Sequence, residues 1–210
     1  MRLFPVLLLV LYLAGCATVP VDAGKGTFLP GPGIDDYPVW QFRGRVSLMQ
    51  GERGWHASLN WSETFGRYRL NLAGPMGQAA LQLDGDSDGV RLRTASGEEL
   101  VAGDADTLVE SATGWQLPVT GIRYWVRGVP APAASAQVFS DADGRLARLL
   151  QSGWDIRYSR FRHVEGRDWP TRMQLAAGDI SVRLVIDEWR LSAGAGAAGT
   201  TGAASTSPAP

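Results

Sequence analysis

Apolar and polar residues alternate along most of the chain between residues 37 and 191. Alternation with a period of two is typical of β-strands that bury one face against a core and expose the other face to water. Successive alternating runs joined by short polar connections predict about eight to eleven antiparallel strands. The runs are Trp40 to Leu48, Trp55 to Trp61, Tyr68 to Leu72, Leu81 to Leu83, Val90 to Leu92, Trp154 to Tyr158, Met173 to Leu175 and Ile180 to Ile186.

Two segments break this period of two. Residues 104–112 place Leu108, Ala112 and the following Trp115 at helical spacing, behind aspartates that can cap a helix. A second helix can form over residues 120–127, where Gly128 and Pro130 would stop it. Successive hairpins with one or two helices inserted in mid-chain predict a mainly β fold, in which a curved antiparallel sheet is covered by short helices.

One predicted hairpin carries an unusual residue at its tip. The runs at residues 68–72 and 81–83 flank the segment Gly74-Pro75-Met76-Gly77. Turns favour residues that supply special backbone angles or bond their own backbone, and a methionine does neither. Two interpretations stay open, since Met76 either packs against a neighbouring loop or is exposed for a function.

The first residues have the pattern of an export signal. Residues 1–15 carry Arg2, an apolar run and then small residues, and they are too short to span a bilayer permanently. Leu13-Ala14-Gly15-Cys16 resembles the lipobox of bacterial lipoproteins, which implies cleavage before Cys16 and acylation of that residue. Cys16 is the only cysteine, so it has no disulfide partner. The alternative is a plain secretion signal with a cysteine nearby.

Composition divides the rest of the chain into three parts. Residues 16–36 contain several Pro and Gly without periodicity, which indicates a lipidated N-terminus and a flexible tether. Residues 37–191 form the folded domain. Residues 192–210 are nearly all Ala, Gly, Ser, Thr and Pro, which predicts a disordered tail.

Charge and composition exclude some partners. The formal net charge is −1 and the basic residues are scattered, which argues against nucleic acid as a partner. The 8 tryptophans bring a large apolar area, which suits either a core or the lining of an apolar pocket.

Sites for catalysis or metal binding are not evident in the sequence. Residues 84–89 resemble the opening of a calcium loop, but its twelfth position is Ala95, where a bidentate glutamate is required. His56 and His163 lie far apart with no further ligand at suitable spacing. Nucleophile elbows and phosphate-binding loops are missing. We therefore expect no catalytic residues, no metal site, no cofactor and no enzymatic activity.

Several short motifs, in order, resemble the outer-membrane lipoprotein receptor family LolB over residues 37–191. Each motif is weak alone, but the ordered set after a lipobox is specific. The motifs are Phe42-Arg43-Gly44-Arg45-Val46, Trp61 followed by Tyr68-Arg69-Leu70, Gly74-Pro75-Met76-Gly77, Trp125-Val126-Arg127-Gly128-Val129-Pro130, Gln151-Ser152-Gly153-Trp154, Trp169-Pro170 and Val185-Ile186-Asp187-Glu188-Trp189.

The resemblance implies an incomplete, open antiparallel β-barrel with a few short covering helices and an apolar cavity, as in LolA and LolB. It implies a receptor that accepts acylated lipoproteins from a soluble, LolA-like periplasmic carrier and inserts them into the outer membrane. The expected protein is a monomer, anchored by lipid in the outer membrane of a Gram-negative bacterium with its domain facing the periplasm. Ala17 supports that address, since by the same resemblance an aspartate there would retain the protein in the inner membrane.

The resemblance also implies roles for individual residues. Pro75, Met76 and Gly77 match the loop whose protruding apolar residue is needed for membrane insertion, with Met in place of the more usual Leu. The tryptophans of the acyl-chain cavity map onto Trp61, Trp125 and Trp154, and Trp189 follows less directly from the closing strand. Each of these tryptophans could equally be an ordinary core residue. The alternative function is a structural or assembly lipoprotein that binds another envelope protein through its surface.

Overall fold

The structure is a computed structural model that describes residues 37–75, 77, 79–132 and 134–192. The predicted lipid attachment residue Cys16 and the predicted insertion residue Met76 lie outside these ranges, as do the signal, the tether and residues 193–210. The last described residue, Ser192, ends the final strand.

Eleven strands and two helices make up the described domain. In chain order they are β1 (Val39–Gln50), β2 (Arg53–Thr64), β3 (Arg67–Ala73), β4 (Ala79–Gly85), β5 (Val90–Thr94), β6 (Glu99–Ala102), α1 (Ala105–Thr113), α2 (Val119–Trp125), β7 (Ala136–Ser140), β8 (Leu146–Gln151), β9 (Trp154–Val164), β10 (Arg167–Ala177) and β11 (Ile180–Ser192).

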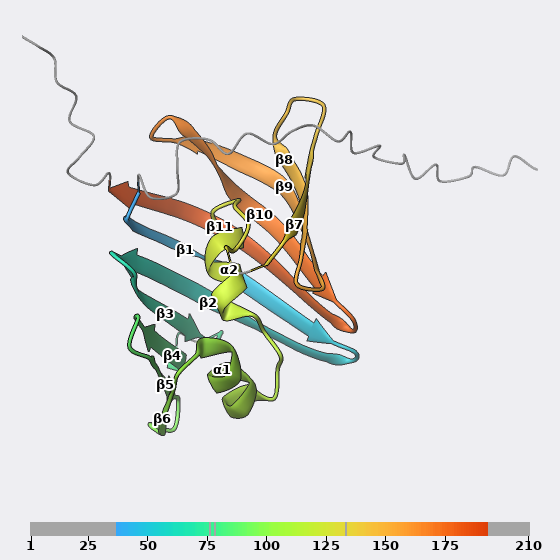
Figure 1. Cartoon of the computed structure of the whole chain (residues 1–210). Helices are drawn as coiled ribbons and strands as arrows, with labels where there is room; N and C mark the ends of the chain where they lie inside the picture. The colour runs from blue at the N-terminus through green and yellow to red at the C-terminus, as the bar shows by residue number, and fades with distance from the viewer. Residues whose placement is uncertain (1–36, 76, 78, 133, 193–210) are drawn as a thin grey trace, which may run out of the picture.

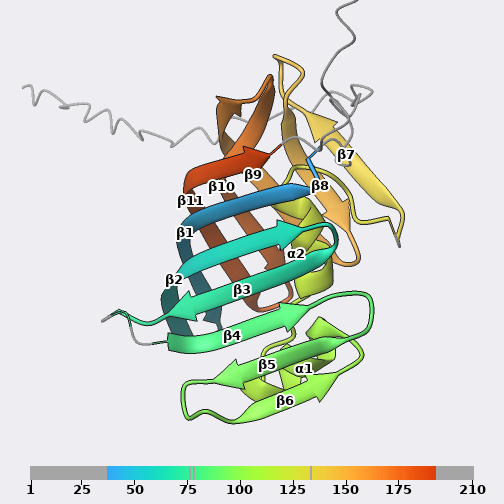
Figure 2. The same ribbon diagram turned by 90° about the vertical axis from the view of Figure 1, so that its left-hand side faces the viewer.

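All strands belong to one antiparallel sheet, in the order β6-β5-β4-β3-β2-β1-β11-β10-β9-β8-β7. The chain runs outward from the central β1 to the edge strand β6, crosses through the two helices to the other edge at β7, and returns to pair β11 with β1. The sheet is curved, and its edges β6 and β7 do not pair with each other (Figures 1 and 2). The predicted open antiparallel barrel with short helices is therefore confirmed.

Both helices lie on the same side of the sheet (Figures 1 and 2). The helix expected over residues 104–112 is α1, where the Asp104 carboxylate caps the N-terminus by accepting from the Thr107 N–H at 2.9 Å. Gly114 ends α1 in the left-handed conformation at φ 74°, and its N–H donates to the Glu110 carbonyl. The helix expected over residues 120–127 is α2. No helix among the described residues is long and apolar enough to cross a bilayer.

The alternation of the sequence decides which face of the sheet is buried. On β1, Trp40, Phe42 and Leu48 are each 1% exposed and face the helices, whereas Arg43 and Arg45 between them are exposed. The same inward face of β11 buries Val182 and Leu184. The core therefore lies between the sheet and the two helices.

A close approach between the two central strands requires a glycine. The β1–β11 register shifts at Arg43 and Gly44, and a Cβ built on Gly44 would lie 2.3 Å from the Val185 carbonyl oxygen. We expect Gly44→Ala to destabilise the domain by about 1–3 kcal/mol, because the backbone of β11 must move. Urea unfolding would measure this change.

Gly103→Ala is the matched control, since a Cβ there meets nothing within 4 Å. Its free energy of unfolding should change by no more than about 0.5 kcal/mol. Equal destabilisation by both substitutions would contradict the proposed close approach at Gly44.

Candidate functional site

An apolar cavity of about 290 Å³ lies between the inner face of the sheet and the helices. Its walls come from strands on both sides of the central β1, from both helices and from the segment that joins the helices. The lining residues are Val46, Leu48, Trp55, Leu59, Trp61, Leu70, Leu72, Ala80, Leu81, Leu83, Val109, Thr113, Trp115, Leu117, Val119, Ile122, Leu175, Val182 and Leu184.

The cavity wall offers almost no polar groups. On the sheet side, the alternating strands present leucine, valine and tryptophan to the cavity and turn their polar residues to the other face. On the helix side, the Thr113 hydroxyl donates to the Val109 carbonyl at 2.7 Å and is already satisfied. A space lined in this way accepts a hydrocarbon chain and disfavours water or charged groups.

Indole N–H groups are the exception in this apolar wall. Within the described part of the chain, the buried indole nitrogens of Trp61 and Trp115 have no hydrogen-bond acceptor, and neither does that of Trp40 nearby. A buried donor without an acceptor costs about 1–3 kcal/mol. Trp61 and Trp115 both line the cavity, so the apolar wall includes two side chains with unused donor capacity.

Of the four predicted cavity tryptophans, Trp61 lines this space. It is 2% exposed and also contacts Trp40 and Phe42, with ring centroids 6.1 Å apart in both pairs. Trp61 therefore joins the cavity wall to the packed aromatic core behind it.

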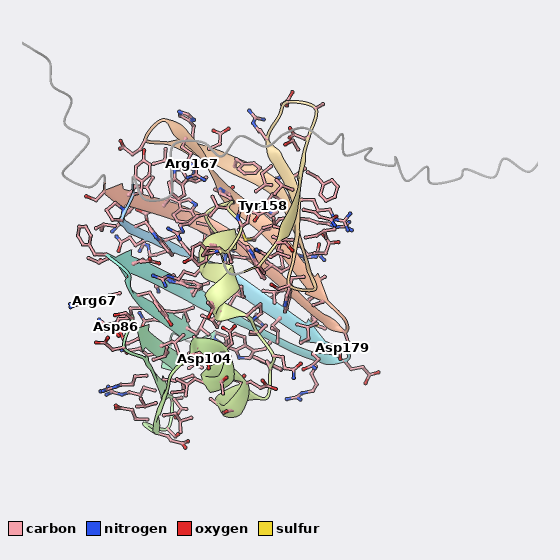
Figure 3. All side chains as sticks on the ribbon, in the orientation of Figure 1. Arg67, Asp86, Asp104, Tyr158, Arg167 and Asp179 are labelled. Atoms are coloured by element: carbon pink, nitrogen blue, oxygen red, sulfur yellow. The ribbon has the colours of Figure 1, made fainter. Side chains whose placement is uncertain are left out.

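Trp125 and Trp154 lie outside the cavity wall, where they contact each other at 6.3 Å. The Trp125 indole donates to the Gln151 side-chain oxygen at 2.8 Å, and its carbonyl accepts from the Tyr158 hydroxyl at 2.9 Å. Burial raises the pKa of Tyr158, which therefore stays a neutral donor. Figure 3 shows Tyr158 beside α2. This network fastens the end of α2 to β8 and β9.

Trp189 also lies outside the cavity wall. Its ring packs against Phe42 and Trp169, each at a centroid distance of 5.0 Å, and its indole donates to the Pro170 carbonyl at 2.8 Å. The geometry of Trp125, Trp154 and Trp189 is that of packed core residues with satisfied or well-packed rings. A role for them in acyl binding stays a prediction.

Two cavity tryptophans were not predicted from the sequence. Trp55 and Trp115 both line the cavity, and their rings lie 5.5 Å apart. The signal was present, because Trp55 follows the alternation of its strand and Trp115 continues the apolar spacing of Leu108 and Ala112 beyond the end of α1. What the sequence could not show is that the two segments meet across the cavity.

The structure describes part of the turn around the predicted insertion residue Met76. Pro75 and Gly77 are exposed, and the Gly77 N–H donates to the Gly74 carbonyl at 2.9 Å. Gly77 has φ 76°, which a glycine adopts without strain. Met76 lies outside the described residues, so its role in insertion stays a prediction.

A buried ion pair holds α2 over the sheet. Glu63 on β2 is 7% exposed, and its carboxylate accepts from Arg123 Nε at 2.7 Å and from Nη2 at 2.6 Å. This two-point contact joins the end of β2 to α2, the helix that supplies Ile122 to the cavity. The pair therefore positions one wall of the cavity.

We expect Glu63→Gln to destabilise the domain by about 3 kcal/mol, because Arg123 would be left half-buried without a counter-charge. Urea unfolding of the variant would measure the loss. In the control Glu99→Gln, the lost pairs with Arg91 and Arg93 lie on the exposed surface. That change should cost no more than about 1 kcal/mol, and a similar cost for both variants would argue against the role of Glu63.

Arg127 adds a second cation at the end of α2. Its guanidinium lies over the rings of Trp40 at 5.4 Å and Tyr124 at 5.2 Å, and its Nε donates to the Arg123 carbonyl. Burial lowers the pKa of Arg127 to about 10, so the side chain remains protonated at neutral pH. The aromatic faces compensate in part for the lost hydration of this charge.

The described residues contain no group of three or more His, Cys, Asp or Glu that could hold a metal ion. His163 contacts Asp168 at 2.9 Å, but both side chains are exposed on the surface. The arrangement in the cavity can hold and release an apolar chain by contact alone.

Known proteins resemble this chain in sequence. The family model described as "Outer membrane lipoprotein LolB" matches residues 38–189. "Outer-membrane lipoprotein LolB" of Pseudomonas aeruginosa is 36% identical over 157 residues, which cover 75% of this chain and 77% of that protein. The protein of the same name from Nitrosococcus oceani is 33% identical over 204 residues, covering 90% and 98%.

A solved structure of a LolA superfamily protein from Nitrosomonas europaea superposes with a TM-score of 0.46 at 8% identity. The match covers 74% of this chain and 87% of that chain.

Proposed function

Because the chain belongs to the LolB family of outer-membrane lipoproteins, we propose that it is a lipoprotein receptor of the outer membrane. It accepts lipoproteins from a soluble periplasmic carrier by binding their acyl chains in its apolar cavity, and it inserts them into the outer membrane. This is a transport function that needs no catalytic group.

The observation that carries the proposal is the apolar cavity between the sheet and the helices. An acyl chain in water costs about 0.8 kcal/mol per methylene, so a receptor must offer apolar surface throughout the transfer. Without ATP, the acyl chain passes from carrier to receptor only if the receptor binds it more tightly. A cavity lined with leucine, valine and tryptophan supports binding of an acyl chain, and the open sheet supports its later release.

The proposed setting follows from the sequence. Cys16 carries the lipid anchor, Ala17 directs the protein to the outer membrane, and the domain faces the periplasm on its tether. Three acyl chains hold such a protein in the bilayer essentially permanently. The partners are a LolA-like carrier, acylated lipoproteins and the lipid of the outer membrane, and the receptor acts as a monomer.

The alternative is an assembly lipoprotein that binds another envelope protein through its surface. Such a protein would have no use for an internal apolar space, and protein interiors are normally filled by their own side chains. A cavity of about 290 Å³ that side chains leave open favours the receptor.

Transfer of a labelled lipoprotein from the carrier tests the proposal. The acceptor is the chain from residue 16 onward with Cys16→Ala, which cannot be lipidated. We expect the lipoprotein to leave the carrier and to co-elute with the acceptor. If the label stays on the carrier at every acceptor concentration, the receptor function is wrong.

A further inference from the structure

A second hollow, of about 680 Å³, lies on the outer face of the sheet, behind the strands that line the cavity. Four strands, β1, β2, β10 and β11, form its floor. We call it the arginine hollow, because Arg45, Arg172 and Arg183 line it. No aspartate or glutamate is among its described lining residues, although the whole chain has a net charge of −1.

The strand register brings these three arginines together. Val185 on β11 pairs with Arg172 of β10 on one side and with Arg45 of β1 on the other. Arg183 precedes Val185 by two residues on the same face, so it is a diagonal neighbour of both, at about 7–8 Å between backbone positions. All three arginines are exposed. Like charges at this spacing repel one another and favour a bound anion.

Little negative charge compensates the cluster. Arg45 contacts Asp187 at 2.9 Å, but both side chains are at least half exposed, so the pair is weak. Arg172 and Arg183 form no ion pair with any residue in the described ranges. Another outer hollow of about 740 Å³ shows the contrast, since Arg67, Arg69 and Arg91 are there accompanied by Asp84, Asp86 and Asp88.

The arginine hollow adjoins the turn predicted to meet the bilayer. Pro75, the residue before Met76, is one of its lining residues. A surface beside that turn comes to the level of the lipid headgroups when the turn touches the membrane. Negative lipid surfaces attract arginines placed in this way, and guanidinium groups bind phosphate oxygens in bidentate fashion.

We propose that the arginine hollow binds the phosphate groups of anionic phospholipids at the bilayer surface and so orients the Pro75 turn toward the membrane. This inference rests on the proposed receptor function, because it assigns the hollow to the insertion step. The cavity and the hollow then serve opposite faces of the same strands, one for the acyl chain and the other for the headgroups.

Flotation with vesicles tests the inference on the chain from residue 16 onward with Cys16→Ala. The vesicles contain phosphatidylethanolamine alone or with one-fifth phosphatidylglycerol. We expect stronger binding to the anionic vesicles, weakened by salt. Arg172→Gln with Arg183→Gln should lower that binding about tenfold or more, and urea unfolding should show that the variant is folded.

The matched control is Arg67→Gln with Arg91→Gln, which removes the same charge from the other outer hollow, where aspartates accompany the arginines. Asp179 lies in the turn just before β11, the strand that carries Arg183 of the arginine hollow. Arg67 lies at the opposite end of the sheet from Asp179 (Figure 3). This control should keep anionic vesicle binding within about twofold. Inorganic phosphate should not compete at millimolar concentration, since a bilayer presents many phosphates together. Competition by free phosphate would show a small-anion site instead and overturn the membrane assignment.

The carrier assay separates this inference from the receptor function. The Arg172 and Arg183 double variant should accept lipoprotein from the carrier as the unsubstituted chain does. Unchanged vesicle binding by the variant overturns the inference, and so does loss of carrier transfer with normal vesicle binding, which would make the hollow a carrier-docking site. Failure of the unsubstituted chain to accept lipoprotein would instead contradict the receptor function.

Discussion

Met76→Glu should leave the domain folded and able to accept lipoprotein from the carrier, yet reduce insertion into the outer membrane at least tenfold. Pro75 and Gly77 on either side are exposed, so a charged residue between them should not disturb the core. Insertion requires contact with the acyl region of the bilayer, where a carboxylate is strongly disfavoured. A tenfold loss corresponds to about 1.4 kcal/mol, well within the cost of desolvating a charge. The measurement is membrane-bound lipoprotein after transfer from a preloaded receptor.

Met76→Leu is the control for this substitution. Leucine has almost the volume and polarity of methionine, so insertion should stay within about twofold. If Met76→Glu inserts as well as the unsubstituted protein, the turn is not the point of membrane contact. If Met76→Glu also loses acceptance from the carrier, the turn acts at an earlier step than we propose.

Ile122→Trp should reduce acyl-chain binding at least tenfold by filling the cavity from the helix side. Ile122 lies on α2, lines the cavity and is only partly buried, so a larger side chain can occupy the open space. Overpacking of a filled core costs about 1–3 kcal/mol, and the cost should fall at the low end where space already exists. Titration with a fluorescent fatty acid and urea unfolding would measure the two effects separately.

Val101→Trp is the matched control, because it adds the same ring on the edge strand β6, where Val101 is 69% exposed. Its fatty-acid affinity should not change. Normal fatty-acid affinity in Ile122→Trp would show that acyl chains bind elsewhere. If Ile122→Trp unfolds globally, the same titration on Ala80→Phe, which fills the cavity from the sheet side, replaces it.

Most of the fold could be predicted because its long strands alternate regularly. The runs on β1, β2 and β11 bury every second residue over most of their length, and the capping aspartate Asp104 marked α1. The edge strands were harder to predict. β6 has 4 residues, none of them fully buried, and β7 has 5 residues with only one buried, so neither shows a clear apolar period. β8 buries Leu146 and Leu149, three positions apart, since the register shifts near its start.

The site was predictable in character but not in detail. Alternation placed Trp61 on the inner face of its strand, but it could not distinguish a residue that lines a cavity from one that packs against other rings, as Trp189 does. That distinction depends on where the helices lie over the sheet, which contacts such as Glu63 with Arg123 determine. The arginine hollow was also invisible, since its residues come from separate strands joined only by register.

The central position of the β1–β11 pair has a consequence for how the protein is made. Trp40 on the first strand pairs with Leu191 near the end of the last, so the middle of the sheet joins the two ends of the domain. Contacts between such distant residues form late and slowly. Before β11 is available, the first hairpins can form while one edge of β1 still exposes unpaired backbone groups beside tryptophans that the complete domain buries, a situation that favours aggregation. A chain whose last strand has not yet paired is therefore exposed to aggregation until β11 joins β1.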